Sequence, residues 1–116
     1  MDSFKKLGRE VRRFAEDRDW AQFHSPKNLS MALAVECAEL MEHFQWLTEN
    51  QSRRLGSQQK REVEMELADI QIYLIRLSQV LSLDLVEACN RKLPENAKKY
   101  PVGKARGVAK KYTDLG

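Results

Sequence analysis

The sequence predicts an all-α fold, an antiparallel bundle of about four helices that association with further copies completes. Apolar residues recur at steps of three and four, which is the spacing of one face of an α-helix. Good helix formers such as Leu, Ala, Glu and Lys are plentiful, whereas five Gly and three Pro are few for an all-β chain with its many turns. A length of 116 residues favours one domain over 1–116, with a basic tail from about residue 100.

The helices are expected at about residues 3–17, 29–48, 57–82 and 84–99. Residues that commonly cap helices stand near three of the four starts: Asn28 or Ser30, Ser57, and Asp84. The two long helices each carry an apolar stripe that should face the core. These stripes consist of Leu33, Cys37, Leu40, Met41, Phe44 and Leu47, and of Val63, Leu67, Ile70, Leu74, Leu77 and Leu81.

Short breaks separate these helices. Gly56 lies in the polar loop between the two long helices, so we expect an antiparallel hairpin there. Pro94 allows a kink or an early end in the last helix, and the tail beyond Pro101 is expected to be irregular. The stripes of the hairpin exceed what one thin bundle can bury, and self-association would cover the excess.

The charge is unevenly distributed along the chain. Residues 1–90 carry 12 Lys/Arg and 15 Asp/Glu, whereas residues 91–116 carry 8 Lys/Arg and 2 Asp/Glu. A basic tail suggests an anionic partner such as a nucleotide, a nucleic acid or an acidic surface. A solvated lysine-rich end is the simpler explanation, and charge alone favours it.

Nothing in the sequence suggests export or a membrane partner. The first residues are charged, and no apolar run reaches membrane-spanning length. We therefore expect a cytoplasmic protein, in which Cys37 and Cys89 are reduced thiols.

Two pairs of acids provide the strongest indication of chemistry. Glu36 and Glu39 fall in the second expected helix, and Glu66 and Asp69 fall in the third. Residues three apart project to the same side of a helix, so a hairpin would bring four carboxylates to one seam. Their neighbours in both helices are mostly apolar.

Such a seam favours a bound cation. Like charges held close together disfavour ionisation, and burying an unpaired carboxylate is costly. Oxygen ligands select hard cations, and magnesium typically joins one or two protein carboxylates to phosphates. Spacing alone makes this only somewhat more favoured than a solvated charged face, which Glu-x-x-Glu usually forms.

Three other readings compete. A di-iron bundle needs Glu-x-x-His motifs, but His43 lies four residues after Glu39 and the third helix has no His. A non-enzymatic nucleic-acid-binding module would use the basic tail and the two Trp, although the acids would repel a phosphate backbone. A purely structural bundle explains the periodicity but not paired acids in apolar surroundings.

Several motifs in order resemble the all-α nucleoside triphosphate pyrophosphatases of the MazG-like superfamily, and within it the dCTP pyrophosphatase branch. The family's signature is Glu-x-x-Glu, a spacer and Glu-x-x-Asp, which the four acids match. The stretches RDWAQFHSPKNL, EHFQW, KLPENAKKYP and KKYTDL are also similar to that branch. The resemblance extends from about Phe14 to Leu115.

The resemblance implies a role for each matching residue. The metal ligands would be Glu36, Glu39, Glu66 and Asp69, holding magnesium or manganese in its place. The nucleobase pocket would be formed by Trp20, His24 and Trp46, with Tyr73 beside the sugar. Lys92 and Asn96 would contact the phosphates, helped by Lys99, Arg106 and Lys111. The resemblance also implies a homotetramer with sites shared between subunits.

The expected reaction is hydrolysis of a deoxynucleoside triphosphate to the monophosphate and pyrophosphate, which removes unwanted nucleotides from the pool. Glu36 or Glu39 would orient or deprotonate the attacking water, and the sequence does not choose between them. Val11 stands where the dCTP branch has a polar residue, often His. The preferred base therefore stays open, although the resemblance favours dCTP or a modified deoxycytidine nucleotide.

Overall fold

A computed structural model describes residues 2–116, and over that range the chain forms helices and turns with no strand. The all-α prediction is therefore confirmed. The chain divides into two compact units, the first ending at Ser82 and the second running from Leu83 to Gly116. No helix of the described part is long and apolar enough to cross a membrane.

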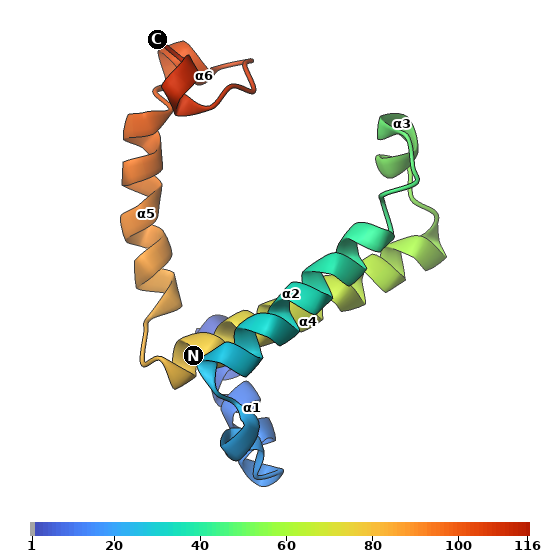
Figure 1. Ribbon diagram of the computed structural model, residues 1–116, viewed down its shortest axis with the longest axis vertical. Helices are drawn as coiled ribbons and strands as arrows, with labels where there is room; N and C mark the ends of the chain where they lie inside the picture. Colours follow the sequence, from blue (N-terminus) through green and yellow to red (C-terminus); the bar gives the residue numbers. More distant parts are fainter. Residues whose placement is uncertain (1) are drawn as a thin grey trace. The chain divides into compact units, whose positions relative to one another are not determined.

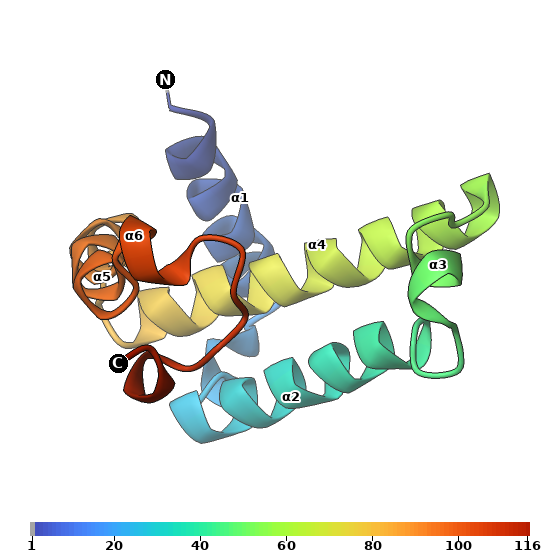
Figure 2. The same ribbon diagram turned by 90° about the horizontal axis from the view of Figure 1, so that it is seen from above.

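The first unit is built on an antiparallel helical hairpin. It contains α1 (Ser3–Asp17), the 3₁₀ turn η1 (Trp20–Phe23), α2 (Pro26–Glu42), α3 (Glu49–Ser52) and α4 (Ser57–Val80). Figures 1 and 2 show α2 and α4 side by side and running in opposite directions, as the short connection between them predicted. In both views α1 lies steeply across the C-terminal half of α4.

The second helix begins earlier than expected. It starts at Pro26, and the cap is Ser25, whose Oγ accepts a hydrogen bond of 3.1 Å from the Asn28 backbone N–H. The predicted caps Asn28 and Ser30 were therefore wrong. A proline at the first helical position has no N–H that needs a partner, and its fixed φ suits a helix. Pro26 therefore begins this helix.

The same helix also ends earlier than expected, at Glu42 rather than Thr48. Turns follow, and Thr48 then caps the short helix α3. Its hydroxyl accepts from the Gln51 N–H at 3.1 Å, while Gln51 Oε1 accepts from the Thr48 N–H at 2.9 Å. This reciprocal pair is a capping box, which satisfies two backbone donors and stabilises a new helix start.

The third expected helix, α4, begins at Ser57 as predicted, but Ser57 is not its cap. Gly56 holds that position, and its N–H donates to Gln59 Oε1 at 3.1 Å. The helix ends at Val80, and Ser82 takes a positive φ of 56° just beyond it.

The buried core is small and lies where α1 meets the hairpin. Its apolar members are Val11, Ala15, Leu29 and Ile75. Much of the predicted core stripe is exposed instead: Cys37, Met41, Leu67 and Leu81. Two paired helices bury only the sides that face each other, and α1 covers only part of the hairpin, so the remaining apolar surface faces outward.

The second unit consists of α5 (Leu85–Lys99), α6 (Val102–Ala105) and the 3₁₀ turn η2 (Tyr112–Asp114). Asp84 caps α5 as predicted, with Oδ1 accepting from the Glu87 N–H at 3.0 Å. The helix continues through Pro94, so no early end occurs there. The tail, expected to be irregular, contains α6 and η2, and Lys104 Nζ donates to the Gly116 carbonyl at 2.7 Å.

Candidate metal and nucleotide site

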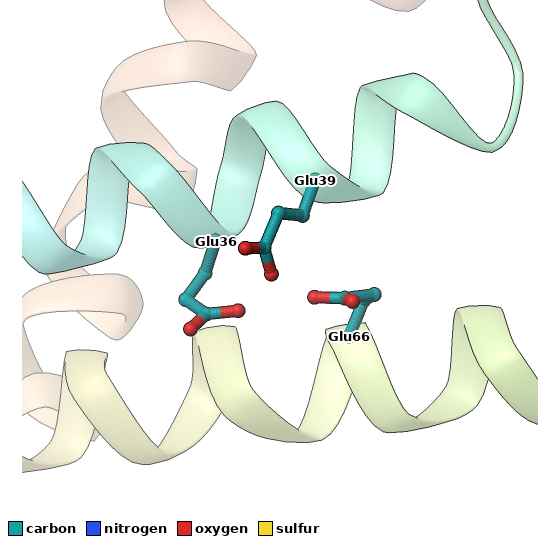
Figure 3. Close-up of side chains that lie close together, drawn as sticks. All are labelled: Glu36, Glu39 and Glu66. Atoms are coloured by element: carbon teal, nitrogen blue, oxygen red, sulfur yellow. The ribbon is translucent and has the colours of Figure 1, made fainter.

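Three carboxylates meet in the seam of the hairpin. Glu36 and Glu39 extend from α2 toward Glu66 on α4, as Figure 3 shows. One oxygen of each lies within 4.8 Å of the others, and all three side chains are half-buried. The prediction that helical spacing and an antiparallel hairpin would unite acids from both helices is correct for these three residues.

The cluster is electrostatically incomplete. Within residues 2–116, Glu36 Oε2 and Glu66 Oε2 are buried and have no hydrogen-bond partner. The pKa of Glu36 is raised from 4.5 to about 7, first by burial, then by hydrogen bonds with Glu39 and Glu66, and then by the negative charges of Glu39 and Asp69. The fold therefore holds carboxyl groups together at a place where the negative charge of their ionised forms is not offset.

A divalent cation fits this arrangement. Two buried oxygens need a partner, and a set of ligands made only of oxygen suits a hard cation. Cation binding would compensate the carboxylate charges and satisfy the orphaned oxygens at once. The donor set thus supports the family expectation of a metal centre.

Asp69, the fourth predicted ligand, lies outside this three-oxygen group. Its side chain is exposed, and its charge contributes to the raised pKa of Glu36. It also lines a neighbouring pocket on the same unit. Asp69 therefore connects the carboxylate seam with that pocket, and its role as a ligand stays a prediction.

The pocket has a volume of about 220 Å³ and lies between α1, the η1 segment and α4. Its apolar wall is formed by Val11, Phe14, Ala15 and Ile72, and the rest by Trp20, His24, Asp69, Tyr73 and Arg76. Trp20 meets the rings of Phe14 and His24 edge-on, with centroids 5.6 and 6.2 Å away. The structure thus brings together two residues of the predicted nucleobase pocket, Trp20 and His24, and Tyr73, which was predicted to lie beside the sugar.

Arg76 was missed by sequence reasoning. It is only 8% exposed, and its Nε donates a 2.9 Å hydrogen bond to His24 Nδ1. The sequence signal that could have identified it is its place in the stretch IYLIRL, where the other residues are apolar or aromatic and a solvated cation is not expected. Burial and the positive charge of Arg76 lower the pKa of His24.

Trp46 does not reach this pocket. It lies in the turns after α2, its side chain is 86% exposed, and it is not among the pocket-lining residues. Its predicted contact with the base stays a prediction.

The predicted phosphate ligands Lys92, Asn96 and Lys99 belong to the second unit. They recur along α5 at steps of four and three, so they share one side of the helix. Lys92 Nζ lies 3.3 Å from Glu95 Oε2, and Lys99 Nζ lies 4.9 Å from the ring centroid of Tyr112. Their contact with phosphate stays a prediction.

Comparison with known proteins identifies the family of this chain. The MazG-like family model matches residues 31–115. The chain is 43% identical to dCTP pyrophosphatase 1 of Mus musculus and 40% identical to that of Homo sapiens, with 99% of this chain and 67% of each relative covered. The crystal structure of a pyrophosphatase from Archaeoglobus fulgidus superposes with a TM-score of 0.82 at 37% identity, covering 87% of this chain and 94% of that one. The chain belongs to the MazG-like family.

Proposed function

We propose that this chain is a magnesium-dependent nucleoside triphosphate pyrophosphohydrolase that converts a deoxynucleoside triphosphate to the monophosphate and pyrophosphate. The observation that carries the proposal is the three-carboxylate seam, which Asp69 connects to a pocket containing an indole and an imidazole. The named activity of its dCTP pyrophosphatase 1 and archaeal pyrophosphatase relatives supports the same reaction. Clearing unwanted nucleotides from the pool is its proposed purpose.

The seam residues hold the metal and prepare the water. Glu36, Glu39 and Glu66 supply the oxygens, with Asp69 as the proposed fourth ligand. Magnesium held there, or manganese in its place, would polarise water and neutralise charge that develops on the phosphates. Glu36 or Glu39 then orients the attacking water or accepts its proton.

The pocket holds the base. Trp20 offers an indole face for stacking, which tolerates several bases, and Tyr73 lies on α4 one turn after Asp69, where the sugar would be. Val11 forms part of the apolar wall of this pocket, which supports a position for it at the base end of the proposed site. A dCTP-like or modified deoxynucleotide is favoured because the curated relatives are named for dCTP.

The di-iron alternative finds no support in the geometry. His43 is not part of the three-carboxylate group, and its Nδ1 lies 3.9 Å from Glu62 Oε2. We propose no stable nucleic-acid partner, because the acids at the seam would repel a phosphate backbone.

We further propose that residues 1–116 work as one domain, because the family match spans both compact units. A homo-oligomer, with a tetramer favoured, would bring Trp46 of another copy to a pocket that its own Trp46 does not reach. A cytoplasmic location stays a prediction.

Two conservative variants test the reaction. Glu39→Gln and Asp69→Asn should each reduce magnesium-dependent release of pyrophosphate by about 10²-fold or more, because each removes a negative oxygen at the metal end. Glu64→Gln, an exposed acid on α4, is the matched control and should keep wild-type turnover. Circular dichroism should show equal helix content in all three.

The assay compares common and modified dNTPs and NTPs and identifies the products directly. Pyrophosphate and a nucleoside monophosphate are expected in equal amounts. Release of orthophosphate, or full activity in both site variants, would exclude the proposed reaction at this site.

A further inference from the structure

A part-buried polar network forms one wall of the pocket, and two of its members, Arg76 and Gln79, have no role in the reaction described above. Arg76 is at its centre, on α4, and is 8% exposed. Its Nε donates to His24 Nδ1 at 2.9 Å, and its Nη1 donates to Gln79 Oε1 at 3.1 Å. Gln79 Nε2 in turn donates to the Gly8 carbonyl at 2.7 Å. The network therefore links the end of the η1 segment, α4 and α1.

The direction of these hydrogen bonds defines the state of the histidine. A guanidinium has only donors, so the Nδ1 that receives the bond from Arg76 must be unprotonated. A neutral imidazole with free Nδ1 carries its proton on Nε2. Protonation of both nitrogens would place an N–H against the Arg76 N–H and two positive charges together. Burial and the charge of Arg76 lower the pKa of His24, which agrees with a neutral ring.

The surroundings of His24 leave the donor available for a ligand. The charged or titratable groups that line the same pocket are Asp69, Tyr73 and Arg76, all from α4. The lining residues from α1 are Val11, Phe14 and Ala15, which are apolar. A base in this pocket therefore meets polar groups from α4 and the η1 segment and only apolar groups from α1.

We propose that Arg76 is a positioning residue, which holds His24 as the Nε2–H tautomer so that the pocket presents a directed donor to an acceptor on the base. The matching chemistry is a ring nitrogen without hydrogen or an exocyclic carbonyl oxygen. This inference rests on the proposed nucleotide function of the pocket. Arg76 acts through His24 and needs no contact with the substrate.

The first test needs no substrate and leaves Arg76 and His24 unchanged. Long-range ¹H–¹⁵N correlation spectra at neutral pH report which imidazole nitrogen carries the proton. The chain has two histidines, so His43→Gln assigns the signals and leaves His24 alone in the spectrum. The Nε2–H pattern is expected for His24. An Nδ1–H pattern or a doubly protonated ring would overturn the proposal.

The second test separates positioning from catalysis. In Arg76→Met, the His24 signal should become a mixture of tautomers, and KM for the preferred dNTP should rise about tenfold while kcat stays within about twofold. Arg76→Lys keeps a cationic donor and should restore most of the tautomer population and of KM. A fall in kcat at constant KM, or an unchanged His24 spectrum in Arg76→Met, would contradict the role.

The two proposals can fail separately. If the wild type hydrolyses no nucleotide while its His24 shows Nε2–H, the proposed function fails and the Arg76–His24 geometry stands. If hydrolysis is normal while His24 carries its proton on Nδ1, the positioning role fails alone. If circular dichroism shows that Arg76→Met does not fold, Gln79→Ala replaces it. This variant removes the hydrogen bond from Arg76 Nη1 to Gln79 Oε1 and should also raise KM, by a smaller factor.

Discussion

At the residue scale, protonation of Glu36 in the seam affects the stability of the fold. Its pKa is about 7 in the folded chain against an ordinary 4.5, so between these pH values the folded chain binds more protons than the unfolded one. Stability from this group is therefore fully present below about pH 4.5 and is lost as pH rises through 7. Above that range, an ionised Glu36 in the seam opposes folding.

Glu36→Gln should accordingly stabilise the metal-free protein at pH 8 and not at pH 4.5. The expected gain in the free energy of unfolding is on the order of 1 kcal/mol, because solvent screens a half-exposed cluster. Urea unfolding at both pH values in the presence of a chelator measures it, with Glu64→Gln as the matched control. Adding magnesium at pH 8 should stabilise the wild type more than the variant. A pH-independent difference would mean that Glu36 is not the titrating group.

The acids were also the residues best predicted from the sequence. Glu36, Glu39 and Glu66 meet because helical spacing and an antiparallel hairpin leave few other arrangements. Arg76 was not anticipated, because its partner His24 lies 52 residues away in an irregular segment and no local pattern reports that contact. Trp46 shows the same limit, since its contact with the base was inferred from resemblance alone.

At the element scale, the start of α2 depends on one side chain. Ser25 Oγ accepts from the Asn28 N–H at the start of the helix that carries Glu36 and Glu39 to the seam. Ser25→Ala should reduce the free energy of unfolding by about 1 kcal/mol, the usual effect of losing an N-cap. Ser30→Ala, whose hydroxyl donates to the Lys27 carbonyl inside the helix, is the control and should change stability less. Equal losses in thermal unfolding would show that Ser25 does not act as the cap.

Helix boundaries were predicted well where a cap and an apolar pattern agree and less well where they compete. Asp84 starts α5 as expected, because the apolar pattern of the helix begins directly after it. Near α2, Ser25, Asn28 and Ser30 all have capping side chains, and only Pro26 at the first helical position distinguishes Ser25. The predicted helix extended too far at its other end because Phe44 and Leu47 continue the apolar period beyond Glu42. In the structure turns follow Glu42, and the capping box of Thr48 begins the separate helix α3.

At the scale of the whole molecule, the exposed apolar surface is the feature that differs most from a domain that is stable as a single copy. Large apolar side chains stay exposed on both hairpin helices: Met31, Val35 and Met41 on α2, and Met65, Leu67 and Ile72 on α4. Soluble monomers rarely leave this much apolar surface uncovered on paired helices. The sequence predicted the excess from the length of its stripes, but it could not show which residues a partner would cover, because periodicity does not distinguish core from interface.

We expect another copy of the chain to cover this surface, and loss of that association should be measurable. Light scattering of the purified protein should give a multiple of the 13.5 kDa chain mass, with four copies favoured. Leu67→Glu places a charge at a side chain that is 52% exposed in the single chain and should shift the mass toward smaller species as concentration falls. Glu64→Lys changes charge at a polar position on the same helix and should keep the wild-type mass. If Leu67→Glu dissociates the assembly, nucleotide turnover should fall with it, because each pocket would lose the proposed contact with Trp46 of another copy. A 13.5 kDa species that is fully active would show instead that one chain suffices.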